Sequence, residues 1–216
     1  LPRDARRMRN SIQRAVLQAC AQLGHTAVPA LFFQEALHGA EGDTIFPTPA
    51  ALGSSWEPQL LTEVMAAVAV GARTLGSHVV LAPVLDLFVD ARFGRLQEGF
   101  GEDPMHVAAF ARAAVLGLQG GGEQADATPK QRRLASDAST AGGRRERRSG
   151  SAQSSARPLR RLRAGKVFAV AKHFVGYGAV AGGINGAASI AGERSILEDH
   201  LRPWRSFVDA GGAGAM

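Results

Sequence analysis

Three short apolar runs along the chain predict strands that are buried on both faces. The runs cover residues 27–33, 79–87 and 167–171. Continuous apolar runs of this length are typical of a parallel sheet, because helices cover such a sheet on both sides. The first run contains Pro29, which suits the start of a strand better than its middle.

Apolar residues at helical spacing predict four amphipathic helices, over residues 10–23, 58–75, 104–118 and 193–210. Pro58 and Pro104 suit the first turn of a helix, and Gly24 and Gly76 suit the position after the last turn. The residues expected to face inward include Ile12, Val16 and Leu23 in the first helix, and Leu197, Leu201, Trp204 and Val208 in the last.

Helices and strands therefore alternate along the chain, and a further strand is expected to begin after residue 210. Strict alternation with apolar strands predicts an α/β fold with a parallel sheet, whose crossover connections are right-handed. A closed (β/α)8 barrel and an open doubly wound sheet both fit this pattern.

Polar side chains follow each predicted strand at its carboxyl end. Glu35 follows the first strand, Asp86 and the charged loop 90–95 end the second, and Lys172 and His173 follow the third. Strands often end at a charge simply because the chain leaves the core for water. Three repetitions favour the other interpretation, a binding site at the carboxyl ends of parallel strands.

The formal net charge of +6 does not belong to the predicted folded parts. Residues 120–166 hold 12 of the 25 Lys and Arg residues but only 4 of the 19 Asp and Glu residues, so the rest of the chain has a net charge of −2. The segment 120–165 consists mostly of Arg, Ser, Ala and Gly, which cannot bury enough surface to offset the entropy of ordering. We expect a disordered basic insertion. Non-native sequence, such as a translated intron, and a tail that binds polyanions are the alternatives.

Several chemistries lack the residues that they require. The single Cys20 supports no disulfide framework and no zinc cluster, and the six histidines show no pair at metal-binding spacing. No phosphate-binding loop of the Walker type and no Gly-x-Ser-x-Gly elbow occurs. No run of 18 apolar residues predicts a membrane span. No cofactor, metal or nucleic acid is therefore expected as a partner.

The predicted strand ends bring carboxylates, a guanidinium, an ammonium and an imidazole to one edge of the sheet. Such groups form charge-assisted hydrogen bonds with a neutral ligand that carries many hydroxyl groups. A sugar ring fits this description, so a small saccharide or oligosaccharide is the expected ligand.

The chain resembles the N-terminal barrel domain of glycoside hydrolase family 3, the β-glucosidase and β-xylosidase family. The matching stretches occur in family order and cover nearly the whole chain outside the insertion. They are Gln34–Gly39, Phe46-Pro47, Ala51-Leu-Gly53, Trp56-Glu-Pro58, Leu81–Asp86, Arg92–Arg95, Glu98–Pro104, Gly117–Gly120, Lys172–Phe174, Glu193-Arg194 and Leu201–Pro203.

The resemblance implies a partial (β/α)8 barrel in which Glu35, Arg92, Lys172 and His173 bind the sugar in the −1 subsite. It also implies retaining hydrolysis by a nucleophilic aspartate and an acid/base residue, neither of which this chain is expected to contain. One departure is Phe93, where the family usually has Trp after the arginine. The other carboxylates of the second loop, Asp86, Asp90, Glu98, Glu102 and Asp103, are interpreted as partners that hold Arg92 and Arg95.

We therefore expect a first barrel part in residues 1–119, the insertion in 120–165 and a continuation of the barrel in 166–216. Since the chain opens at Leu1, it is interpreted as a piece of a longer exo-acting β-glucosidase or β-xylosidase and as inactive by itself. A non-catalytic sugar-binding remnant is the alternative, and polyanion binding through the insertion is a weaker one. The resemblance favours a secreted protein, whereas the residues themselves fix neither the compartment nor the oligomeric state.

Overall fold

A computed structural model describes residues 2–120 and 164–216 of the chain. Its four strands form one parallel sheet in the order β1-β2-β3-β4, which is also their order along the chain. The strands are β1 (Phe33–Gln34), β2 (Val79–Val80), β3 (Phe168–Ala171) and β4 (Gly214–Ala215). The α/β class with a parallel sheet is thereby confirmed. The predicted insertion lies outside the described residues except at its two ends.

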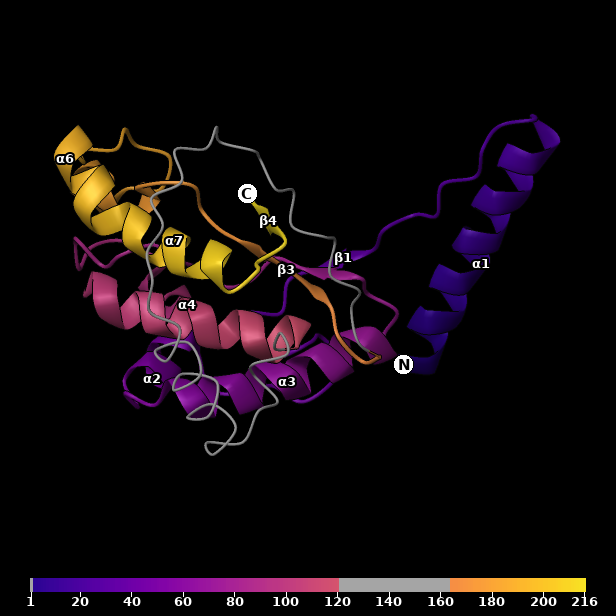
Figure 1. Cartoon of the computed structure of the whole chain (residues 1–216), viewed down its shortest axis with the longest axis horizontal. Helices are drawn as coiled ribbons and strands as arrows, with labels where there is room; N and C mark the ends of the chain where they lie inside the picture. Colours follow the sequence, from indigo (N-terminus) through magenta and orange to yellow (C-terminus); the bar gives the residue numbers. More distant parts are fainter. Residues whose placement is uncertain (1, 121–163) are drawn as a thin grey trace, which may run out of the picture.

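Helices connect each strand to the next. They are α2 (Pro49–Gly53) and α3 (Pro58–Thr74) between β1 and β2, α4 (Pro104–Gln119) between β2 and β3, and α6 (Glu193–Ser195) and α7 (Leu201–Asp209), with a π-helical turn η4 (Ile196–His200) between these two, between β3 and β4. Helix α1 (Pro2–Gln22) precedes β1. Short 3-10 helices occupy Leu96–Glu98 (η1), Tyr177–Ala179 (η2) and Ala181–Gly183 (η3). Helix α4 packs between α3 and α7, so these three helices form one layer beside the strands (Figure 1).

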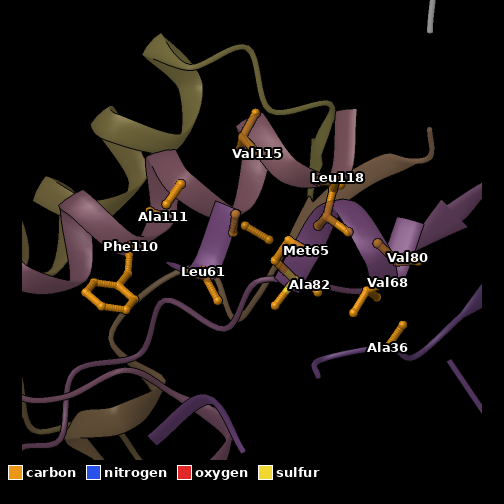
Figure 2. Close-up of a cluster of buried hydrophobic side chains, with 14 of the residues drawn as sticks. Ala36, Leu61, Met65, Val68, Val80, Ala82, Phe110, Ala111, Val115 and Leu118 are labelled. Carbon is orange, nitrogen blue, oxygen red and sulfur yellow. The ribbon is translucent and has the colours of Figure 1, made fainter. Parts of the chain in front are cut away.

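The hydrophobic core lies between this helical layer and the sheet. Leu61, Met65 and Val68 from α3 meet Phe110 and other apolar residues of α4, and Val80 lies on the strand side of the same cluster (Figure 2). All of these side chains are almost completely buried. At roughly 1.5–3 kcal/mol for each large apolar side chain, burial of this cluster stabilises the packing of the helical layer on the strands whose ends carry the polar residues.

The strands β1 and β2 are shorter than the apolar runs from which they were predicted. The run 27–33 enters the sheet only at Phe33, because Ala30 is held outside the sheet by two hydrogen bonds with the side chain of Gln13 (2.8 and 3.0 Å). The run 79–87 leaves the regular ladder after Val80, and Pro83 lacks the N–H that a central strand requires. A single bridge between Val84 and Lys172 continues the contact with the third strand.

The first and last helices form, but their bounds and buried faces differ from the prediction: α1 begins at Pro2 and not near residue 10, and the last helix is divided into α6, η4 and α7. Helix α1 projects away from the remaining helices (Figure 1), and Ile12 and Leu23 are exposed. In the last helix Trp204 is buried as expected, whereas Leu197 and Val208 are exposed and Phe207 is buried instead. Leu197 lies in the π-helical turn η4, which interrupts the α-helical spacing on which the prediction of its inward face depended.

Candidate functional site

Glu35 and Lys172 meet at the carboxyl ends of two strands. Glu35 follows β1 and Lys172 follows β3, with β2 between them, and the long lysine side chain spans this distance. The Nζ atom of Lys172 donates to both carboxylate oxygens of Glu35, at 3.0 and 2.8 Å. The Lys172 side chain is 3% exposed and that of Glu35 is 62% exposed. A buried ammonium group requires such a partner, so the pair fixes both side chains.

The pair lines an open cleft with a volume of about 380 Å³. The segment that follows β1, the η1 turn and Lys172 form its walls, which are lined by Glu35, Ala36, Leu37, His38, Gly39, Arg95, Glu98 and Lys172. The imidazole of His38 is fixed by a 2.6 Å hydrogen bond between Nδ1 and the carbonyl oxygen of Phe46. Charged donors and acceptors therefore dominate the polar lining of the cleft.

Arg95 and Glu98 line the cleft as an ion pair with two parallel hydrogen bonds of 2.6 and 2.7 Å. The hydrogen bond from Arg95 lowers the pKa of Glu98, and the charges of Arg95 and Lys172 lower it further. The hydrogen bond to Glu98 raises the pKa of Arg95. The pairing confirms the loop-fixing role predicted for Glu98, but the sequence did not indicate that both residues face the cleft.

A signal for these two residues does exist in the sequence. Arg95 and Glu98 are separated by three positions, and η1 converts this spacing into side-chain contact. The same loop follows a strand end, where binding residues gather in parallel sheets. The position after a strand end, together with the three-residue spacing of opposite charges, would have identified both residues as candidates for the lining of a binding cleft.

Arg92 is not among the residues that line the cleft. Its side chain is 73% exposed and forms hydrogen bonds with both carboxylate oxygens of Asp90, the shortest at 2.7 Å. Hydrogen bonds from the Arg92 side chain and backbone lower the pKa of Asp90 to about 2. The partnership predicted between Asp90 and Arg92 is confirmed. A role for Arg92 at the cleft stays a prediction, since Arg92 is not one of the lining residues.

His173 is held by the carboxylate of Asp86, which was predicted to hold an arginine. Its Nδ1 lies 2.7 Å from Oδ2 of Asp86, and its ring packs edge-on against Tyr177 with centroids 4.6 Å apart. The prediction that Asp86 holds an arginine is therefore wrong, because its carboxylate pairs with the imidazole of His173 instead. His173 neighbours the cleft without being one of its lining residues.

Asp103 also differs from the prediction. Its side chain accepts hydrogen bonds from the backbone N–H groups of Met105 and His106, at 2.7 and 2.8 Å, and so caps the N-terminus of α4. An aspartate before Pro104 is a typical helix start, and this local bond satisfies two otherwise free donors. Asp103 is therefore a helix cap and does not hold an arginine.

The described residues define an α/β protein whose parallel strands end at a charged, polar cleft. Comparison with known proteins gives the family. The profile of the Glycosyl hydrolase family 3 N terminal domain matches residues 4–216, so the chain belongs to this family. None of the described helices is long and apolar enough to cross a membrane.

Relatives named as glycosidases cover most of the chain. A beta-xylosidase of Formosa agariphila is 32% identical over 197 residues, which are 88% of this chain and 22% of the xylosidase. A beta-glucosidase structure from Erythrobacter marinus superposes with a TM-score of 0.77 at 30% identity, covering 100% of this chain and 24% of that one. A mutant beta-glucosidase from Listeria innocua in complex with laminaribiose gives a TM-score of 0.72 at 26% identity, over 96% and 23% of the two chains. The chain thus spans about a quarter of the length of these proteins.

Proposed function

We propose that this chain supplies the sugar-binding part of a retaining β-glycosidase that acts on β-linked glucosides or xylosides. The observation that carries the proposal is the buried Lys172 paired with Glu35 in a polar cleft of a family 3 domain. A carboxylate and an ammonium group side by side offer an acceptor and a donor to adjacent sugar hydroxyls. Glu35, Arg92, Lys172 and His173 are the proposed binding residues.

The proposal also covers the barrel architecture and the location of the two catalytic carboxyl groups. The four parallel strands in chain order, with their helices in one layer, support a segment of a (β/α)8 barrel. Retaining hydrolysis needs a nucleophilic carboxylate and an acid/base residue. We assign both to the larger part of the relatives that this chain does not match. The 216-residue chain by itself is then expected to release no product from an aryl β-glucoside or β-xyloside.

The test is a kinetic comparison in the full-length parent that the proposal implies. Lys172→Ala should lower kcat/KM on aryl β-glucosides and β-xylosides by about 100-fold or more, because a charge-assisted bond to the transition state is lost. Arg112→Ala removes an exposed cation from α4 and serves as the matched control, with unchanged kinetics. An unchanged kcat/KM in Lys172→Ala would refute the role of this lysine.

A non-catalytic sugar-binding remnant is the second candidate, and the same cleft supports it. The gene downstream of the codon for Met216 separates the two. A further strand that ends in an aspartate supports the glycosidase, whereas a stop codon supports the remnant. Hydrolysis of an aryl β-glucoside by the 216-residue chain at the rate of a complete enzyme would contradict both.

A further inference from the structure

The backbone sets Asp86 beside His173. The N–H of Leu85 donates to the carbonyl oxygen of Lys172 at 2.7 Å, and the N–H of Lys172 donates to that of Pro83 at 3.0 Å. These two bonds fix the register between the segment after β2 and the end of β3. Asp86 and His173 directly follow the bonded residues Leu85 and Lys172, and their side chains meet at 2.7 Å.

Asp86 is closely enclosed where it meets the imidazole. It is 4% exposed. A Cβ atom on Gly178 would lie 2.2 Å from the carbonyl oxygen of Leu87 and 3.3 Å from Cβ of Asp86, so the loop 176–179 packs directly on this segment. The carboxylate therefore has little freedom to turn away from His173, and the Tyr177 ring restricts the imidazole from another side.

The contact with Asp86 determines which ring nitrogen of His173 faces away from this carboxylate. An ionised carboxylate accepts hydrogen bonds and cannot donate them, so the proton shared with Asp86 belongs to Nδ1. In the neutral ring Nε2 is then an acceptor that points away from Asp86. Within the part of the chain that the structure describes, no protein group is paired with Nε2. Lys172, the preceding residue, lines the cleft.

We propose that Asp86 is a positioning residue that fixes the tautomer and the orientation of His173, so that Nε2 accepts a hydrogen bond from a hydroxyl of the bound sugar. The inference rests on the proposed function, because it takes the sugar as the partner of Nε2. Asp86 itself contacts no sugar. It acts through the imidazole, in the way that carboxylates behind histidine ligands set the ring orientation at other sites.

The first test needs no activity and uses the 216-residue chain. Side-chain ¹H–¹⁵N correlation spectra report which imidazole nitrogen carries the proton, and His173→Gln assigns the signal. The wild-type chain should show Nδ1–H on His173. Asp86→Asn should populate the Nε2–H form, because the amide can donate to Nδ1. Asp103→Asn is the matched control, since asparagine caps a helix as well as aspartate does.

The second test measures sugar binding by the same chain, with D-glucose and D-xylose as probes. Asp86→Asn should raise the Kd about tenfold, the scale of one hydrogen bond lost from a ligand. The double variant with His173→Gln should bind no more weakly than His173→Gln alone, because Asp86 acts only through the imidazole.

The outcomes separate the inference from the proposed function. An Nε2–H tautomer in the wild-type chain overturns the inference even if Asp86→Asn fails to fold. A tautomer that is unchanged in folded Asp86→Asn overturns it as well, as does additive weakening in the double variant. Wild-type chain that binds neither sugar contradicts the proposed function, and the tautomer then still decides whether Asp86 orients His173.

Discussion

At the scale of single residues, burial determines which ionisable groups need a charged partner and which histidines have a lowered pKa. Lys172 is almost completely enclosed and is stabilised by a largely exposed carboxylate. His200 is 4% exposed, and burial lowers its pKa against the opposing charges of Asp199 and Asp86. Burial also lowers the pKa of His78, and Arg73 and Arg9 lower it further. The two histidines therefore resist protonation in the folded protein, which makes stability depend on pH.

We predict that the free energy of unfolding falls as the pH decreases from 7.5 to 5.5. Below about pH 6.5 the unfolded chain binds protons on both histidines that the folded chain does not yet bind, so protons favour unfolding. Urea denaturation at the two pH values measures the fall. His200→Gln should reduce it, because one of the two groups no longer titrates.

His25→Gln is the matched control, since His25 lies exposed in the link between α1 and β1. This variant should keep the wild-type pH dependence. A fall in stability that is as large in His200→Gln as in the wild-type chain would contradict the role given to His200.

At the scale of elements, the close approach of α3 and α4 holds the helical layer together. A Cβ atom on Gly117 of α4 would lie 2.5 Å from Cβ of Met65 and 2.6 Å from the carbonyl oxygen of Thr62, both in α3. The hydroxyl of Thr62 donates to the carbonyl oxygen of Ala113 at 3.3 Å and ties the same surfaces together. Glycine at position 117 therefore permits a contact that any side chain would push apart.

Gly117→Ala should lower the free energy of unfolding by about 1–3 kcal/mol, because the added methyl group meets backbone and Cβ atoms that cannot turn aside. Gly94→Ala is the matched control, since a Cβ atom there meets nothing within 4 Å. Thermal and urea unfolding measure both variants. Equal stability of Gly117→Ala and Gly94→Ala would show that the two helices separate without cost.

At the scale of the whole molecule, the two ends of the predicted insertion lie side by side. The N–H of Val167 donates to the carbonyl oxygen of Leu118 at 3.0 Å, and Nζ of Lys166 donates to that of Gly117 at 2.9 Å. The end of α4 and the start of β3 are thus joined directly. A connection of a few residues, as is usual between a helix and the next strand, would span this junction.

We predict that deletion of residues 121–163 leaves the fold intact, with a Tm within about 4 °C of the wild-type value, which corresponds to roughly 1 kcal/mol. The deleted segment carries 11 Lys and Arg against four acidic residues, so the formal net charge changes from +6 to −1. Salt-dependent binding to DNA, if the wild-type chain has any, should disappear. Loss of cooperative unfolding would contradict the prediction for the fold, and binding that persists would contradict the polyanion alternative.

The sequence predicted the type and order of the elements, because apolar periodicity and prolines at helix starts are local properties. It did not predict that the first strand begins only at Phe33 and the second ends at Val80, or which face of the last helix is buried. Those depend on a contact with a distant residue, on the missing N–H of proline within a sheet and on a π-helical turn. The contact with Gln13 and the packing of the last helix arise only in the tertiary structure, whereas the missing N–H of Pro83 is a local property whose effect on the strand end the apolar pattern did not reveal.

The same division holds for the candidate site. The sequence by itself determined that charged residues stand at the strand ends and that Glu35 and Lys172 belong among them. The sequence also predicted the pairing of Asp90 with Arg92, but only the tertiary structure decided that Lys172 pairs with Glu35 and His173 with Asp86, and that Arg92 lies beyond the cleft lining. The physical reason is that strand-end position follows from local patterning, whereas the choice of an ionic partner depends on the register between strands and on burial, which arise only when the sheet and its helical layer pack together.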